Sequence, residues 1–131
     1  MNLAQSFDLT SGANLLRIIC GLFLVPHLVI KFRNQTFVKG FMANAGLNPP
    51  AAWLYAAFAI EIVASVCLVF DLFTVYAASL AAVFLSVAAW ASWKISGGKW
   101  IWNFGGAEFP LFWALCCVVV AMQAAASQVP V

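Results

Sequence analysis

Long apolar runs alternate with short polar segments along this chain. Apolar residues dominate four stretches, at about residues 15–32, 51–70, 75–95 and 111–126. Each is close to the roughly 20 residues that an α-helix needs to cross the ~30 Å hydrocarbon core of a bilayer. We therefore predict four membrane-spanning helices, an arrangement that leaves both ends of the chain on the same side of the membrane.

The composition supports the same conclusion. Hydrophobic residues make up 66% of the chain and charged residues only 8%, whereas about a quarter of the residues in a soluble domain are charged. The sequence therefore predicts an all-α integral membrane protein, a four-helix bundle formed by residues 1–131 as a single domain. The net charge of +2 is scattered, and without a basic run no nucleic-acid binding is expected.

The first apolar run contains a helix breaker. Pro26 lies within the stretch LLRIICGLFLVPHLVIKF, where it removes a backbone hydrogen bond and leaves the carbonyl group near Leu22 without its helical partner. Inside a membrane such a carbonyl must be satisfied by other protein groups or by water. We therefore predict a kink beside His27, together with a local cavity.

An amphipathic segment follows the first run. Phe37, Phe41 and Ala45 share one helical face, and Gly46 would end the helix. Apolar residues on one face and polar residues on the other are typical of a helix that lies in the membrane interface. The sequence therefore predicts a short interfacial helix between the first two spans.

Basic residues gather in the connections after the first and third spans. These connections, with the span ends beside them, hold Lys31, Arg33, Lys39, Lys94 and Lys99. The positive-inside rule then places both long connections in the cytoplasm and both termini outside it. The N-terminal segment before the first run has no Lys or Arg, so we do not expect a cleavable signal peptide.

Ionisable residues inside the predicted spans are the candidates for function, because such groups are costly in lipid. At 1.5 Å per residue, His27 lies ~7 Å and Glu61 ~15 Å from the cytoplasmic end. Together with Lys31 and Glu108 they form a predicted polar ladder that descends from that face. Arg17 approaches Glu61 from the outer side, and its long side chain is expected to reach inward.

Each of these residues also has a structural interpretation. Glu61 can pair with Arg17 or His27 only to fix the register of the helices, a known use of buried polar groups. Lys31 can serve as an interfacial anchor, and Glu108 can stabilise the start of the fourth helix through the helix dipole. A haem ligand is not expected, because His27 is the sole histidine of the chain.

Aromatic and cysteine residues complete the candidate groups. We expect an aromatic mouth to the polar site, formed by Trp100, Trp102, Phe104 and Phe109, as in the aromatic belts at membrane interfaces. The four cysteines all lie in apolar runs and none forms a C-x-x-C motif: Cys20, Cys67, Cys116 and Cys117. They are interpreted as small buried hydrophobic residues, and no metal site is predicted.

Four segments in order resemble the DoxX family of small four-helix bacterial membrane proteins. They are LLRIICGLFLVPHLVIKF, FVKGFMANAGLNPP, AIEIVASVCLVFDLFT and GGAEFPLFW, between Leu15 and Trp113. The resemblance implies a multi-pass protein of the bacterial inner membrane and an association with redox or envelope-stress complexes. The positions that carry the family pattern are Arg17, His27, Lys31, Glu61, Gly105, Gly106, Glu108 and Pro110.

Three functional hypotheses follow. The first is a membrane subunit of a redox assembly that anchors a protein partner and holds a quinone or another polar headgroup near His27, Glu61 and Glu108. The second is a pathway for protons or small molecules, which would require a homo-oligomer because four short helices enclose little space. The third is a structural assembly protein. A stand-alone enzyme is not expected, because no nucleophile–base set or nucleotide-binding motif is present.

Overall fold

The computed structural model describes residues 3–101, 103 and 105–128. Within this part of the chain the fold is all-α, as predicted. The helices are α1 (Leu3–Ser6), α2 (Gly12–Leu22), α3 (Leu24–Arg33), α4 (Gln35–Asn44), α5 (Pro50–Val69), α6 (Thr74–Ile95) and α7 (Glu108–Gln128).

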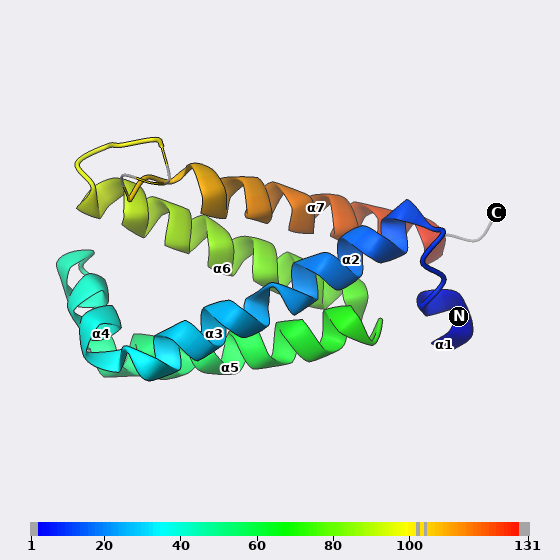
Figure 1. The fold of residues 1–131 in the computed structure, drawn as a ribbon, viewed down its shortest axis with the longest axis horizontal. Helices are drawn as coiled ribbons and strands as arrows, with labels where there is room; N and C mark the ends of the chain where they lie inside the picture. Colours follow the sequence, from blue (N-terminus) through cyan, green and yellow to red (C-terminus); the bar gives the residue numbers. More distant parts are fainter. Residues whose placement is uncertain (1–2, 102, 104, 129–131) are drawn as a thin grey trace.

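Four helical segments are long and apolar enough to cross a membrane. They are Gly12–Arg33, which combines α2 and α3, Pro50–Val69, Thr74–Ile95 and Glu108–Ser127. These segments confirm the four spans predicted from the sequence. The N-terminal α1 and the end of α7 lie at one end of the bundle, and α4 lies at the other (Figure 1).

The predicted kink divides the first span. α2 ends at Leu22 and α3 begins at Leu24, while Phe23 between them keeps a near-helical backbone with φ −72° and ψ −14°. Pro26 has no N–H group to donate to the Leu22 carbonyl, which explains why the helix is interrupted one turn before it.

The helices of the bundle form two sides. α6 and α7 run side by side along one side of the molecule, and α2, α3 and α5 run along the other (Figure 1). α2 packs against both α5 and α7, whereas α3 packs mainly against α5. The two sides therefore meet near the termini and diverge toward α4, which stands across the open end (Figure 1).

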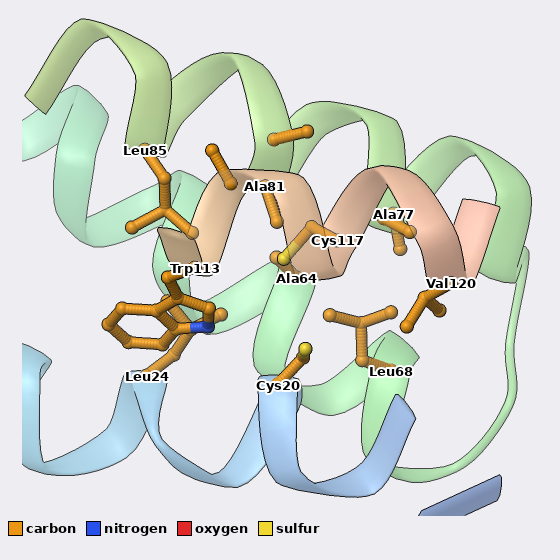
Figure 2. Packing of buried hydrophobic residues seen from close by; sticks show 13 residues of the cluster. Cys20, Leu24, Ala64, Leu68, Ala77, Ala81, Leu85, Trp113, Cys117 and Val120 are labelled. Atoms are coloured by element: carbon orange, nitrogen blue, oxygen red, sulfur yellow. The ribbon is translucent and has the colours of Figure 1, made fainter. Parts of the chain in front are cut away.

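Small side chains dominate the packing of α6, as predicted. α6 and α7 form the most extensive helix pair of the described chain, because alanines allow the two backbones to approach closely. Figure 2 shows this core, to which α2, α5, α6 and α7 all contribute. Its buried members include Cys20, Ala64, Leu68, Ala78, Ala81, Leu85, Trp113 and Cys117. Cys20 and Cys117 are free and buried, in line with their predicted hydrophobic role.

A glycine sets the distance between α2 and α5. A Cβ atom on Gly21 would lie 2.9 Å from Leu68 Cβ and 3.1 Å from the Ser65 carbonyl oxygen. The Ser65 hydroxyl donates a hydrogen bond of 2.9 Å to the Gly21 carbonyl. The closest approach of the two helices therefore depends on the missing side chain at Gly21.

The short helix predicted after the first span is present as α4. Met42 is buried, and Val38 and Phe41 pack with it against Leu54 and Ala57 of α5. The helix ends before Gly46, whose φ of +87° suits a residue without a Cβ atom. α4 is therefore part of the bundle, while its position in the membrane interface stays a prediction.

Candidate intramembrane binding site

A buried ion pair joins the first span to the second. Lys31 Nζ of α3 lies 2.5 Å from Glu61 Oε1 of α5, and their side chains are 13% and 0% exposed. The same ammonium lies over the Phe84 ring of α6, 4.5 Å from the ring centroid. The attraction between a cation and the face of an aromatic ring adds to the stabilisation of the charged form of Lys31. Three spans thus position one cation.

His27 lies one helical turn before Lys31, on the same face of α3. Its Nε2 atom is 3.9 Å from Glu61 Oε1, and its side chain is 42% exposed. The imidazole packs edge to face against Trp113 of α7, with ring centroids 5.8 Å apart. The structure therefore brings together His27, Lys31 and Glu61, three of the five predicted polar site residues.

The second oxygen of Glu61 is buried without a partner. Among the residues that the structure describes, no group donates a hydrogen bond to Oε2. An unsatisfied buried acceptor costs on the order of 1–3 kcal/mol, and more if it is charged. Buried polar atoms without a hydrogen-bond partner are uncommon in native structures, and this one makes Glu61 a candidate for function.

An apolar cavity of about 710 Å³ opens beside this cluster, and His27 and Lys31 line it. Glu61 is not among the lining residues, so it stands behind Lys31 as its counter-ion. The wall is built by α3, α4, α5, α6 and the start of α7. The aromatic lining residues are Phe37, Phe41, Trp53, Phe84, Phe109 and Trp113. The cavity lies where α3 and α5 diverge from α6 and α7, on the side of the bundle closed by α4 (Figure 1).

Arg17 belongs to a different site. Its guanidinium donates hydrogen bonds to the carbonyls of Leu68, Val69 and Ser6, and its Nε lies 3.8 Å from Asp71 Oδ1. The expectation that Arg17 reaches toward Glu61 is therefore wrong. The C-terminal carbonyls of α5 have no helical partners and attract a cation, which explains where the side chain goes.

The sequence interpretation missed the role of Asp71. Its carboxylate accepts hydrogen bonds from the hydroxyls of Ser6, at 2.7 Å, and Thr74. Burial raises the pKa of Asp71, but these hydrogen bonds and the charge of Arg17 together hold the pKa below its ordinary value. The available signal was an arginine on the terminal side of the membrane, where Asp8 and Asp71 are the acidic residues.

Glu108 begins α7 but does not line the cavity, unlike the two residues after it, Phe109 and Pro110. Its backbone N–H donates to the Trp100 carbonyl at 3.0 Å. A Cβ atom on Gly106 would overlap the backbone of Trp100, so this glycine allows the preceding loop to fold against the start of α7.

The predicted aromatic mouth is brought together only in part. Phe109 lines the cavity, whereas Trp100 is exposed and is not among the lining residues. Trp102 and Phe104 lie outside the described residues.

These features define the protein as a four-helix membrane protein with a polar cluster beside an apolar cavity. The DoxX family model matches residues 12–93, more than half of the chain. The chain therefore belongs to the DoxX family. The matched range includes Arg17, His27, Lys31 and Glu61, while the GGAEFP segment lies beyond it. Comparisons with curated proteins and with solved structures gave no match.

Proposed function

We propose that this DoxX protein is a membrane subunit of a redox assembly and that its cavity holds the headgroup of a lipid-soluble quinone. Ligand pockets in proteins typically have volumes of roughly 300–1,000 Å³, with mostly apolar walls and a few polar groups that orient the ligand. The cavity of about 710 Å³ beside Lys31 and His27 matches this pattern. That match is the observation that carries the proposal.

The chemistry of the polar groups suits a quinone. A quinone carbonyl is a neutral hydrogen-bond acceptor, and an ammonium group offers three donors. Lys31 uses one donor on Glu61 Oε1, which leaves further donors for a ligand. His27 adds a second polar group one turn away, and Phe84 and Trp113 provide aromatic surfaces for a planar ring.

The proposal is tested by quinone binding to the purified protein in detergent. Trp53 and Trp113 line the cavity, so we expect ubiquinone-1 to quench part of the tryptophan fluorescence in a saturable manner. Lys31→Met and His27→Ala should weaken binding at least about tenfold, which corresponds to about 1.4 kcal/mol. Lys99→Met removes an exposed lysine outside the cavity and serves as the matched control. Unsaturable quenching that is equal in all variants would exclude the quinone site.

The redox assembly requires a protein partner, since the chain is small and needs another subunit to deliver electrons. Native mass spectrometry of the protein, purified from its own membranes in mild detergent, should show a second polypeptide. A homo-oligomer or a monomer that carries only phospholipid would argue against the redox-subunit proposal.

We further propose a bacterial inner-membrane location with both termini outside the cytoplasm. The end of the bundle that carries α4 also holds Arg33, Lys39, Lys94 and Lys99 (Figure 1), and cytoplasmic loops are enriched in such residues. Single cysteines introduced at positions 39 and 10 into a cysteine-free background provide the test. An impermeant maleimide added to intact spheroplasts should label position 10 only.

A proton pathway is the second candidate, and it is favoured by the Glu61 oxygen that has no hydrogen-bond donor within the described chain. Buried carboxylates often mark proton routes through membranes. Proton flux into proteoliposomes that is abolished by Glu61→Gln would support this function. No flux at any pH gradient would exclude it.

A further inference from the structure

Two basic residues line the cavity, whereas the acidic residue that pairs with one of them does not. Lys31 and His27 line the cavity, and none of its described lining residues is acidic. The carboxylate of Glu61 sits directly behind Lys31, 2.5 Å from its ammonium group, with its side chain fully buried. The positive charge that faces a ligand is therefore already neutralised from the protein side.

A bilayer would offer this cavity many anions. Fatty acids and phospholipids combine an apolar chain with a negatively charged group, and an unneutralised lysine in an apolar cavity would bind them by charge-assisted hydrogen bonds. A lipophilic neutral ligand can occupy such a site only if the anions are disfavoured.

We propose that Glu61 determines the ligand class of the cavity, which accepts a neutral headgroup with hydrogen-bond acceptors and rejects anionic lipids. This inference rests on the proposed function, because it concerns the same cavity and explains how a quinone would be selected in it. Glu61 acts as a specificity-determining residue through Lys31 and need not contact the ligand itself.

The geometry explains the selection. Two acceptors on one ammonium group lie only about 5 Å apart when each hydrogen bond is roughly 2.8 Å long. A ligand carboxylate on Lys31 would therefore place a second negative charge close to Glu61 in an apolar environment, where repulsion between like charges is weakly screened. A carbonyl oxygen accepts from the same ammonium without adding a charge. The Phe84 ring, 4.5 Å from Nζ, keeps the ammonium in place.

The test compares two ligands that differ only in charge. Laurate and methyl laurate share one acyl chain, and each is titrated against ubiquinone-1 bound to the wild-type protein at pH 8, with tryptophan fluorescence as the readout. We expect methyl laurate to displace the quinone at least about tenfold more effectively than laurate. Equal displacement, or a preference for laurate, would overturn the inference. This comparison uses only the wild-type protein and does not depend on how any variant folds.

Two variants test whether the Glu61 carboxylate causes the preference for the neutral ligand. Glu61→Gln should increase laurate affinity at least about tenfold, because the ammonium then lacks its counter-ion. Glu108→Gln removes a carboxylate that does not line the cavity, and it should leave the preference unchanged. If Glu61→Gln folds and does not bind laurate more tightly, Glu61 is not the determinant.

The outcomes separate this inference from the proposed function. If ubiquinone-1 binds and laurate competes as well as its ester, the quinone site stands and the selectivity fails. If ubiquinone-1 does not bind, the quinone proposal fails. Tryptophan quenching by a brominated methyl laurate that exceeds quenching by the brominated acid would then still support selection of neutral lipids. No binding of either brominated lipid would overturn the inference as well.

Discussion

Lys31 and Glu61 connect α3 to α5 through a contact of 2.5 Å between Nζ and Oε1. Lys31 lies near the C-terminal end of α3, and Glu61 lies near the middle of α5. One interaction thus holds the cavity-forming helix on its neighbour and also positions the cation that faces the cavity.

A double-mutant cycle should show strong coupling between these two residues. Lys31→Met leaves a buried carboxylate without its cation, and we expect it to lower the free energy of unfolding by about 3 kcal/mol. Lys31→Met combined with Glu61→Gln removes both charges, so we expect the double variant to lie within about 1 kcal/mol of the wild type. Reversible unfolding in mixed micelles provides the measurement. Additive losses in the double variant would contradict this prediction.

The planar hydrogen-bonding geometry of the Arg17 guanidinium, and not only its positive charge, should stabilise the fold. The guanidinium contacts three carbonyls and Asp71, and a lysine cannot reproduce this planar fork. We expect Arg17→Lys and Arg17→Ala both to lower the melting temperature in detergent, with a loss of about 2–4 kcal/mol for alanine. Arg33→Ala changes an exposed arginine and is the control. Full stability of Arg17→Lys would show that charge is sufficient.

Stability should fall in acid because of Asp71, which lies outside the spanning segments. Its pKa is lowered in the folded protein: burial raises the pKa, but hydrogen bonds from Thr74 and Ser6 and the charge of Arg17 outweigh that effect. Because the pKa of Asp71 is lower in the folded than in the unfolded protein, its carboxylate stabilises the fold at pH values above the unfolded-state pKa of about 3.9. This stabilisation is lost as the pH falls through the folded-state pKa.

The measurement is the melting temperature of wild type and Asp71→Asn between pH 3 and pH 7. We expect Asp71→Asn to be less stable at pH 7 by about 1–2 kcal/mol, and the difference should shrink below about pH 4. A difference that is constant across this range would exclude the titration of Asp71 as its cause.

The sequence was informative about the elements of the fold. Apolar run lengths predicted the four spans, and Pro26 predicted the break between α2 and α3. These features depend on local physical chemistry, namely the length of a bilayer crossing and the missing N–H group of proline. The small residues of α6 likewise predicted its close packing with α7.

The partners of the polar residues were less predictable. Arg17, His27 and Lys31 all lie on the first span, and either His27 or Arg17 was a plausible partner for Glu61. Which one approaches Glu61 depends on the rotation of α3 after the kink and on the register against α5, and neither is encoded in spacing alone. The cavity also depends on tertiary structure, because it exists only where α3 diverges from α6 and α7.

The contact at Gly21 predicts a sensitive position in the core. Gly21→Ala would place a Cβ atom 2.9 Å from Leu68 Cβ, so we expect a loss of about 1–3 kcal/mol from overpacking. Gly40→Ala is the matched control, since a Cβ atom added there on α4 would meet nothing within 4 Å. Alanine is the better helix former by roughly 1 kcal/mol, so the control should be neutral or stabilising. Equal effects at both positions would contradict the close approach of α2 and α5.

Lys94 ties α4 to α6 across the open end of the bundle, because its ammonium group donates a hydrogen bond of 2.9 Å to the carbonyl of Ala45. Loss of one such hydrogen bond costs about 1 kcal/mol. We therefore expect Lys94→Met to increase amide hydrogen exchange in α4 about fivefold, with little change in α6 and α7. The contact lies at the end of α4, so the effect should be local rather than global. Lys99→Met, which changes another exposed lysine at the same end of the bundle, should leave α4 exchange unchanged. Equal exchange in Lys94→Met and the wild type would show that the contacts of Met42 and Phe41 with α5 are sufficient to hold α4 in place.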